Sequence, residues 1–260
     1  MGTFDGQIAF ITGGARGQGR SHAVHLASLG ADIVIVDSIK DNVTTPYGMA
    51  TQADLDETVR LVEAQGRKAY ARAIDVRDLN GLIAFADEVV ERYGKIDILL
   101  ANAGIMTAVP IAEMSGEVWA ETVDINLTGV FNSFRAVLPH MVKAGYGRVV
   151  ATSSGGGHIG FNNLAHYCAA KGGIVSLTRA LAQEAAPKGV LVNAIAPGPI
   201  DTDMLRGFSA DWRAWKQTQL PLGRFGTVDE VAPTALLLAS AAGANYVGQT
   251  LSPNGGDVFL

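Results

Sequence analysis

The stretch IAFITGGARGQGRSHAVHLAS, residues 8–28, decides the fold. It begins with an apolar run, turns through several closely spaced glycines and continues into a helical pattern. Glycines let the backbone turn sharply and approach a bound pyrophosphate, and the N-terminus of a helix offers unpaired N–H groups and the positive end of a dipole. A glycine-rich turn can be purely structural, but one placed between a strand and a helix predicts a nucleotide-binding loop.

The alternation of apolar β-branched runs and helical patterns continues along the whole chain. Strands are expected at 8–11, 33–36, 68–74, 96–100, 148–152, 190–195 and 249–252, and helices near 17–29, 54–65, 78–93, 116–144, 165–186 and 227–241. Continuous apolar strands separated by helices indicate a parallel sheet covered on both faces. We therefore predict an α/β fold, a Rossmann-type doubly wound parallel sheet of about seven strands with helices on both faces. Because no linker or repeat interrupts the pattern, residues 1–260 are expected to form a single dinucleotide-binding and catalytic domain.

Two segments do not fit this alternation. Residues 38–53 form a long connection after the second strand, where α/β folds usually use about 2–6 residues. The second segment, 198–226, carries three large aromatic residues, Phe208, Trp212 and Trp215. Long excursions at the carboxyl ends of parallel strands are where such folds build ligand sites. We interpret 38–53 as an insertion and 198–226 as a substrate lid; packing of the tryptophans on the body or on a partner subunit is the alternative.

The composition excludes several classes of protein. Of the 260 residues, 48% are apolar and 17% are charged, and the net charge is −5. The apolar content excludes a disordered chain, and the acidic balance argues against a nucleic-acid partner. No apolar run reaches the ~18 residues of a membrane span and residues 1–6 lack signal-peptide features, so we expect a cytoplasmic protein without a membrane partner. The low charged fraction favours a homo-oligomer.

Neither cysteine nor histidine indicates a metal site. The single cysteine, Cys168, excludes a disulfide framework and a cysteine-rich metal site. His22 and His25 are spaced as metal ligands can be, but no cysteine or cluster of acids accompanies them. We interpret both histidines as packing residues and predict no metal.

The residue at the end of the second strand predicts which dinucleotide binds. Asp37 lies at about the distance from the glycine loop expected of an acid that accepts hydrogen bonds from an adenosine ribose. Its carboxylate would repel a 2′-phosphate, so NAD is expected rather than NADP. Arg16, within the loop, would favour NADP or else pair with a neighbouring acid, and we give Asp37 the greater weight.

A tyrosine and a lysine four residues apart form the candidate catalytic pair. On a helix, Tyr167 and Lys171 lie on one face, one turn apart. A nearby ammonium stabilises a phenolate and lowers the pKa of the phenol, which can then take a proton from an alcohol as hydride leaves its carbon. Ser154, just after the 148–152 strand, can hydrogen-bond the substrate oxygen, although from position alone Ser153 can do the same.

The motifs and their order resemble those of the short-chain dehydrogenase/reductase family over nearly all of the chain. They are Gly13-x-x-x-Gly17-x-Gly19 after Thr12, Asp75-Val76, Asn102-Ala103-Gly104, Asn126, Ser154, Tyr167-x-x-x-Lys171, and Pro197-Gly198 with Thr202. The resemblance implies a catalytic tetrad of Asn126, Ser154, Tyr167 and Lys171, in which Asn126 holds a water that passes protons towards Lys171. Taken alone, Asn126 can equally be a residue that bends its helix or caps a neighbour.

The same resemblance implies an NAD site and an assembly. Asp75 and Val76 would flank the adenine, residues 102–104 would support the ribose, and Ile200 and Thr202 would hold the nicotinamide carboxamide. The assembly would be a homotetramer. The full set expected to bind NAD is Gly13, Arg16, Gly17, Gln18, Gly19, Asp37, Asp75, Val76, Asn102, Ala103, Gly104, Tyr167, Lys171, Pro197, Ile200 and Thr202.

Within this family, the insertion resembles that of the mycofactocin-associated branch, which includes carveol dehydrogenase-like enzymes. The residues that carry this likeness are Thr45-Pro46-Tyr47 and the run from Gly13 to His22. The branch implies a tightly held NAD that a redox partner recycles in place, with secondary alcohols as substrates. We expect the insertion to fold over the adenosine half of NAD and slow its release; a surface loop that extends a subunit contact is the alternative.

The substrate is predicted to be a neutral, hydrophobic alcohol or ketone. Apolar residues expected to line its pocket are Ile105, Met106, Val109, Pro110, Ile111, Phe208, Trp212 and Trp215, and no arginine clamp for a carboxylate or phosphate is evident. The competing hypothesis is a non-catalytic NAD(H)-binding module that senses redox state. Such a module would keep the glycine loop and Asp37 but has no need of all four tetrad residues, so we favour the enzyme.

Overall fold

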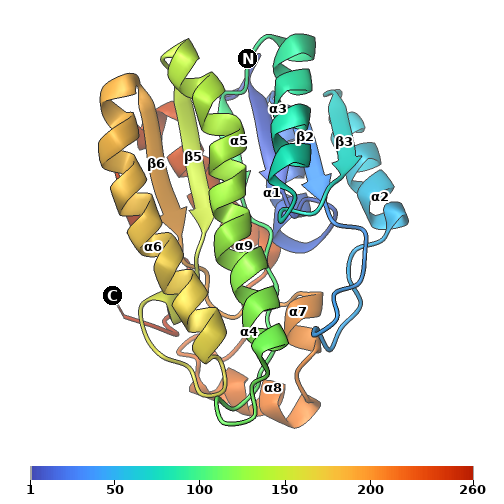
Figure 1. Ribbon diagram of the computed structural model, residues 1–260, viewed down its shortest axis with the longest axis vertical. Helices are drawn as coiled ribbons and strands as arrows, with labels where there is room; N and C mark the ends of the chain where they lie inside the picture. Colours follow the sequence, from blue (N-terminus) through green and yellow to red (C-terminus); the bar gives the residue numbers. More distant parts are fainter. Residues whose placement is uncertain (1, 260) are drawn as a thin grey trace.

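Seven parallel strands form the sheet that carries the site, in a computed structural model that describes residues 2–259 (Figure 1). Along the sheet the order is β3-β2-β1-β4-β5-β6-β7. The strands are β1 (Ile8–Thr12), β2 (Asp32–Asp37), β3 (Ala69–Ala73), β4 (Ile98–Ala101), β5 (Gly147–Thr152), β6 (Val190–Ile195) and β7 (Thr250–Leu251). The doubly wound parallel sheet predicted from the sequence is confirmed.

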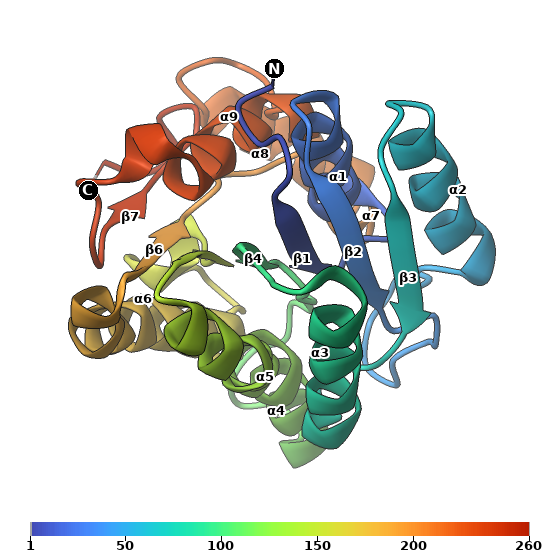
Figure 2. The same ribbon diagram turned by 90° about the horizontal axis from the view of Figure 1, so that it is seen from above.

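Helices cover both faces of this sheet (Figure 2). Side chains alternate along β1, so that Ile8 and Phe10 join the core on one face while Ala9 and Ile11 join the core on the other. One face is covered by α1 (Gly17–Ser28), α2 (Gln52–Glu63) and α9 (Val228–Ala239), and the other by α3 (Leu79–Tyr93), α5 (Gly129–Ala144) and α6 (Ala165–Ala185). Helix α4 (Gly116–Val123) packs against α6. No helix within residues 2–259 is both long and apolar enough to cross a membrane.

The long helix expected over 116–144 is interrupted. A π-helical turn, Asp124–Thr128, separates α4 from α5. The amide of Asn126, inside this turn, donates to the carbonyl oxygen of Thr122 (2.9 Å) and to that of Ile105 (3.0 Å). A π turn carries one more residue than an α turn and is common at functional sites. Here it turns Asn126 inward against the segment that follows β4.

The strand order reverses at β1, which pairs with β2 on one side and β4 on the other. In open α/β sheets, the crevice at such a reversal, beyond the carboxyl ends of the strands, is where ligands bind. The insertion follows β2 at this edge, and two short helices, α7 (Asp203–Arg206) and α8 (Ala210–Gln219), extend beyond it (Figure 1). The two segments that departed from the sequence pattern therefore both lie where a ligand would bind.

Candidate active site

A cavity of about 680 Å³ lies at the carboxyl edge of the sheet. Its walls come from the glycine loop, the segment after β4, the insertion, α6 and the lid segment that contains α7 and α8. Of the residues that the sequence predicted to be catalytic or to bind NAD, Gly19 and Asn126 lie outside the wall. The others all line it: Gly13, Arg16, Gly17, Gln18, Asp37, Asp75, Val76, Asn102, Ala103, Gly104, Ser154, Tyr167, Lys171, Pro197, Ile200 and Thr202.

Close backbone packing explains the glycines of the loop. Gly13 has a φ of +67°, and a Cβ at this position would lie 2.7 Å from the Cα of Ala103. A Cβ on Gly19 would lie only 2.0 Å from the carbonyl oxygen of Gly13, so Gly19 lets α1 lie directly against the loop although it does not line the cavity. The amide of Asn102 donates to the carbonyl oxygen of Gly13 (3.1 Å), and the hydroxyl of Thr12 accepts from the backbone N–H of Asn102 (3.2 Å).

The N-terminus of α1 fits an anionic group such as a pyrophosphate. Its first turn contains no acidic residue, and its N-cap residue, Arg16, makes no side-chain capping bond. Gly17, with a φ of +56°, leaves open space on the cavity side, since the nearest atom to a Cβ there would be Cγ2 of Thr202 at 3.7 Å. The unpaired N–H groups of a helix start and its dipole favour negative charge at such a place.

Two carboxylates line the end of the cavity nearest β2. Asp37 accepts hydrogen bonds from the backbone N–H groups of Ala15 (2.9 Å) and Ser38 (2.8 Å), which fix the direction of its side chain. Burial raises the pKa of Asp37, and these two N–H groups oppose that rise. Asp75 pairs with the guanidinium of Arg77. Both acids are therefore held in fixed positions on the cavity wall.

Arg16 resolves one alternative that the sequence left open, because it pairs with a neighbouring acid. Its guanidinium forms an ion pair with Asp203 of α7 (3.1 Å) and donates to the carbonyl oxygen of Gly48 in the insertion (2.7 Å). The insertion also packs on the lid directly, since a Cβ on Gly207 would lie 2.9 Å from Cδ1 of Tyr47. Arg16 thus joins the insertion to the lid above the glycine loop.

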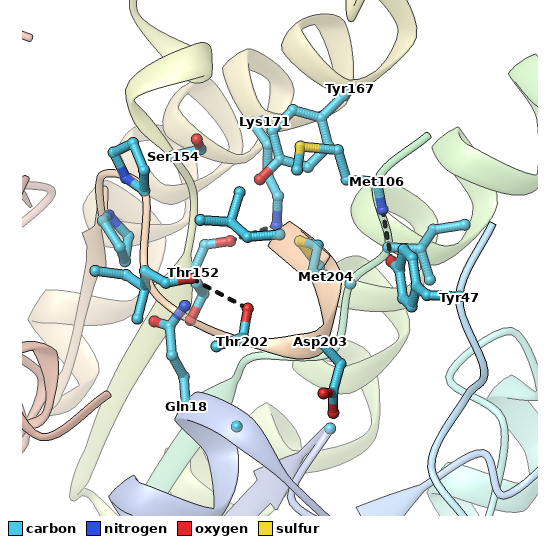
Figure 3. Close-up of a pocket in the computed structure, with 18 of the residues that line it drawn as sticks. Gln18, Tyr47, Met106, Thr152, Ser154, Tyr167, Lys171, Thr202, Asp203 and Met204 are labelled. Atoms are coloured by element: carbon cyan, nitrogen blue, oxygen red, sulfur yellow. Dashed lines mark hydrogen bonds between the residues drawn. The ribbon is translucent and has the colours of Figure 1, made fainter. Parts of the chain in front are cut away.

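Tyr167 and Lys171 project from α6 into the cavity, with Ser154 across from them (Figure 3). Lys171 donates to the carbonyl oxygen of Thr152 (2.8 Å), and its Nζ lies 5.6 Å from the centre of the Tyr167 ring. The hydroxyl of Ser153 is buried and donates to the carbonyl oxygen of Lys171 (2.8 Å), so it is occupied within the fold. The geometry therefore favours Ser154 over Ser153 as the hydroxyl available to a ligand.

Burial shifts the pKa values of Tyr167 and Lys171 in the directions that favour the neutral form of each residue. Burial raises the pKa of Tyr167 to about 12, with the hydroxyl of Ser154 opposing the shift. Burial lowers the pKa of Lys171 to about 7. Desolvation disfavours charge on either group, so the pKa of each would change again if a new charge or hydrogen bond were placed nearby. Perturbed phenol and ammonium groups side by side in a cleft are typical of acid–base chemistry.

Asn126 is fully buried behind this pair. Its side-chain oxygen accepts from the backbone N–H of Ile105 (3.3 Å), and its amide donates back to the carbonyl oxygen of the same residue (3.0 Å). A Cβ on Gly104 would lie 2.7 Å from that side-chain oxygen and 3.3 Å from Nζ of Lys171. Asn126 therefore fixes the backbone beside Lys171, and its predicted water stays a prediction.

The insertion contributes a residue that sequence reasoning did not assign to the site. Tyr47 lines the cavity, and its hydroxyl accepts from the backbone N–H of Met106 (3.0 Å; Figure 3). It lies close enough to Tyr167 to raise the pKa of that phenol electrostatically. Glu121, buried on α4, anchors the same segment by accepting from the backbone N–H of Thr44 (2.9 Å). Burial opposes ionisation of Glu121, but the Thr44 donors hold its pKa below the usual value.

The lid contributes aromatic walls at the other end. Phe208 stacks on Trp212 with ring centres 4.2 Å apart, and Trp215 lies 6.5 Å from Trp212; all three line the cavity. The two tryptophans therefore face the cavity. Ile105 and Met106 also line it, as expected. The prediction was wrong for Val109, Pro110 and Ile111, because the chain turns outward after residue 108 and leaves Ile111 67% exposed.

Sequence reasoning also missed charged residues at this end. Lys216 of α8 and Asp257 near the C-terminus both line the cavity and form an ion pair. They are 41 residues apart, and no motif links them.

His22 is buried in α1, where burial and then His25 lower its pKa to about 4. The described residues contain no group of three or more metal-ligating side chains.

The chain is similar to known enzymes in both sequence and structure. Residues 7–212 match the short chain dehydrogenase family. The chain is 44% identical to (-)-trans-carveol dehydrogenase of Rhodococcus erythropolis over 209 residues, which cover 79% of this chain and 75% of that protein. It is 34% identical to the 3-oxoacyl-(acyl-carrier-protein) reductase FabG of Escherichia coli over 253 residues, 97% of this chain and 98% of that one. The crystal structure of carveol dehydrogenase from Mycobacterium avium in complex with NAD superposes with a TM-score of 0.95 at 36% identity, covering 99% of both chains.

Proposed function

Since this chain belongs to the short-chain dehydrogenase family, an oxidoreductase family, we propose that it interconverts a hydrophobic secondary alcohol and its ketone with NAD. The observation that carries the proposal is a single cavity with the glycine loop and Asp37 at one end and Tyr167 and Lys171 at the other. When bound, NAD would accept a hydride from the alcohol carbon or return it to the ketone.

Tyr167 is proposed as the general acid and base. In alcohol oxidation its phenolate would take the hydroxyl proton, and in ketone reduction its phenol would give that proton back. Ser154 would hold the substrate oxygen beside the phenol. Lys171, when protonated, would stabilise the phenolate, and Asn126 would keep the backbone around Lys171 in place.

The dinucleotide is proposed to be NAD rather than NADP. The start of α1 would receive the pyrophosphate, and Asp37, whose side chain is fixed by two backbone N–H groups, would accept from the adenosine ribose. A 2′-phosphate would meet the carboxylate of Asp37, while the nearest cation, Arg16, is paired with Asp203. The remaining predicted NAD-binding residues that line the cavity are proposed to bind NAD, while Gly19 is proposed to support the glycine loop from behind.

A carveol-like substrate is supported by the apolar walls of the cavity and by the carveol dehydrogenases among the relatives. The direct test follows reduced-nicotinamide absorbance after carveol is added to the purified protein, first without and then with added NAD. Steady turnover with NAD would support the dehydrogenase. No change in absorbance under either condition, with NAD binding intact, would favour the alternative of a non-catalytic redox-sensing module.

The insertion and the lid are proposed to retain NAD, so that a separate redox partner recycles it in place. Three of the hydrogen bonds that tether residues 38–53 to the rest of the protein support this proposal: Arg16 to Gly48, Tyr47 to Met106, and Thr44 to Glu121. We also propose that the protein forms a homotetramer and that residues 1–260 form a single domain.

Deleting residues 40–50 should accelerate NADH dissociation by about tenfold or more, because it removes these three hydrogen bonds. Tyr47→Phe removes one acceptor and should accelerate dissociation by about fivefold, the value of one hydrogen bond. Displacement of NADH by excess NAD, followed by fluorescence in a stopped-flow instrument, measures both. Tyr146→Phe, outside the cavity, is the matched control. An unchanged off-rate in the deletion would instead make the insertion a surface loop.

A further inference from the structure

The ion pair between Lys216 and Asp257 lies on the cavity wall next to the lid aromatics Phe208, Trp212 and Trp215. Their side chains are only 15% and 6% exposed, with Nζ and Oδ1 2.5 Å apart. Nζ also lies 5.4 Å from the centre of the Phe161 ring, and Phe161 packs on the cluster that contains Tyr167. The pair therefore lies at the substrate end of the cavity. Removing two charges from water opposes folding, so apolar residues would serve a purely apolar pocket better.

The donors and charges of the pair determine what it can recognise. A lysine ammonium carries three N–H donors, and the hydrogen bond recorded for Lys216 within residues 2–259 uses one of them, to Asp257. Of the lysine and arginine side chains within residues 2–259 that line the cavity, Arg16 belongs to the glycine loop and Lys171 lies next to Tyr167 at the proposed reaction centre. Lys216 is therefore the cation placed to meet the far end of a substrate.

We propose that the Lys216–Asp257 pair is a specificity filter that accepts a neutral oxygen on the substrate and rejects a carboxylate. A carbonyl, hydroxyl or ester oxygen remote from the reacting carbon accepts a hydrogen bond from Lys216 without meeting a net charge. A carboxylate meets Asp257 as well, and like charges in a poorly solvated site repel strongly. The inference rests on the proposed function and narrows its substrate class to apolar skeletons with a second, uncharged oxygen.

Three matched ketones test the filter. They are 4-propylcyclohexanone, which has no remote oxygen, methyl 4-oxocyclohexanecarboxylate, whose remote oxygen is neutral, and 4-oxocyclohexanecarboxylate, whose remote group is an anion. With NADH in excess, the wild type should give its highest kcat/KM with the ester and its lowest with the acid. The readout is the ratio of kcat/KM values between probes, which a uniform loss of activity leaves unchanged.

The two single variants should change these ratios in different ways. Asp257→Asn uncovers the ammonium, so the acid should gain about tenfold or more relative to the ester, as expected for a new charged hydrogen bond. Lys216→Met removes the donor, so the advantage of the ester over 4-propylcyclohexanone should disappear. Lys143→Met, the same change on an exposed lysine outside the cavity, should alter neither ratio.

A pair that merely fastens α8 to the C-terminal segment would behave differently. Both variants would then change all three kcat/KM values by the same factor, and that result would overturn the filter. If the wild type reduces none of the ketones, the proposed reaction fails for this class, and calorimetric binding of the same compounds to the NADH-loaded protein tests the filter by itself. Binding that still prefers the ester, with Asp257→Asn improving binding of the acid, would sustain the filter; unchanged binding ratios would refute it.

Discussion

Tyr167→Phe is expected to lower kcat for alcohol oxidation by about 10²–10⁴-fold, the usual contribution of a positioned acid–base group. Phe keeps the ring that packs between Met106, Leu164 and Leu205 and removes the hydroxyl that would exchange the proton. The affinity for NAD, measured by fluorescence titration, should therefore change little. Tyr146→Phe removes a hydroxyl from outside the cavity and should leave kcat unchanged.

The pH profile separates an acid–base role from a role in packing. Burial raises the pKa of Tyr167 to about 12, so the phenolate fraction increases with pH across the whole neutral and mildly alkaline range. In the wild type, kcat/KM for alcohol oxidation should rise as pH rises, whereas ketone reduction, which needs the phenol, should not. In Tyr167→Phe the residual oxidation should lose this dependence. A variant that retains both its rate and its pH profile would remove Tyr167 from the chemistry.

Gly19→Ala should weaken both the fold and the binding of NAD. The new Cβ would lie 2.0 Å from the carbonyl oxygen of Gly13 and 2.9 Å from the amide nitrogen of Asn102, so α1 must move away from the loop that it supports. Overpacking of this kind destabilises by about 1–3 kcal/mol, and in a chain of this size each kcal/mol lowers Tm by about 2–4 °C. Because the shift moves the N–H groups proposed to hold the pyrophosphate, NAD affinity should fall by about tenfold or more.

A matched substitution isolates the effect of that contact. Gly116 begins α4, and a Cβ there would meet nothing within 4 Å, so Gly116→Ala should leave Tm and NAD affinity unchanged. Thermal unfolding with and without NAD measures both quantities for the two variants. Equal Tm values for Gly19→Ala and the wild type would mean that the loop can shift without a loss of stability. That result would contradict the close packing of Gly19 against Gly13.

The sheet was predictable because its central strands, β1, β2, β4, β5 and β6, are buried on both faces, which makes each of them a nearly continuous apolar run. The burial of all five residues of β1 shows this directly. The glycine loop, the end of β2 and the Tyr167–Lys171 spacing were equally readable, because each depends on residues close together in sequence. Most of the site residues that were predicted from such local signals lie on the wall of one cavity.

What the sequence could not predict depends on contacts between distant segments. The π turn at Asp124–Thr128 goes with hydrogen bonds between Asn126 and Ile105, 21 residues away. Helix α8 has no buried residue, so it lacks the apolar stripe by which helices are recognised, and its tryptophans face the cavity instead. The pairing of Lys216 with Asp257 exists only once the lid and the C-terminal segment have come together.

The π turn between α4 and α5 also bears on how this protein tolerates insertions and deletions. A π turn is an α-helix that has taken up one additional residue, and losing one residue from 124–128 would restore regular α-helical geometry at little local cost. Because the π turn takes up the extra residue locally, α4 and α5 would keep their relative phase after such a deletion, and Glu121 would stay against Thr44. Asn126 belongs to the turn itself, so its amide would lose its contacts with the backbone of Ile105. The extra residue therefore serves the position of Asn126 beside Lys171 of α6, and the two flanking helices do not depend on it.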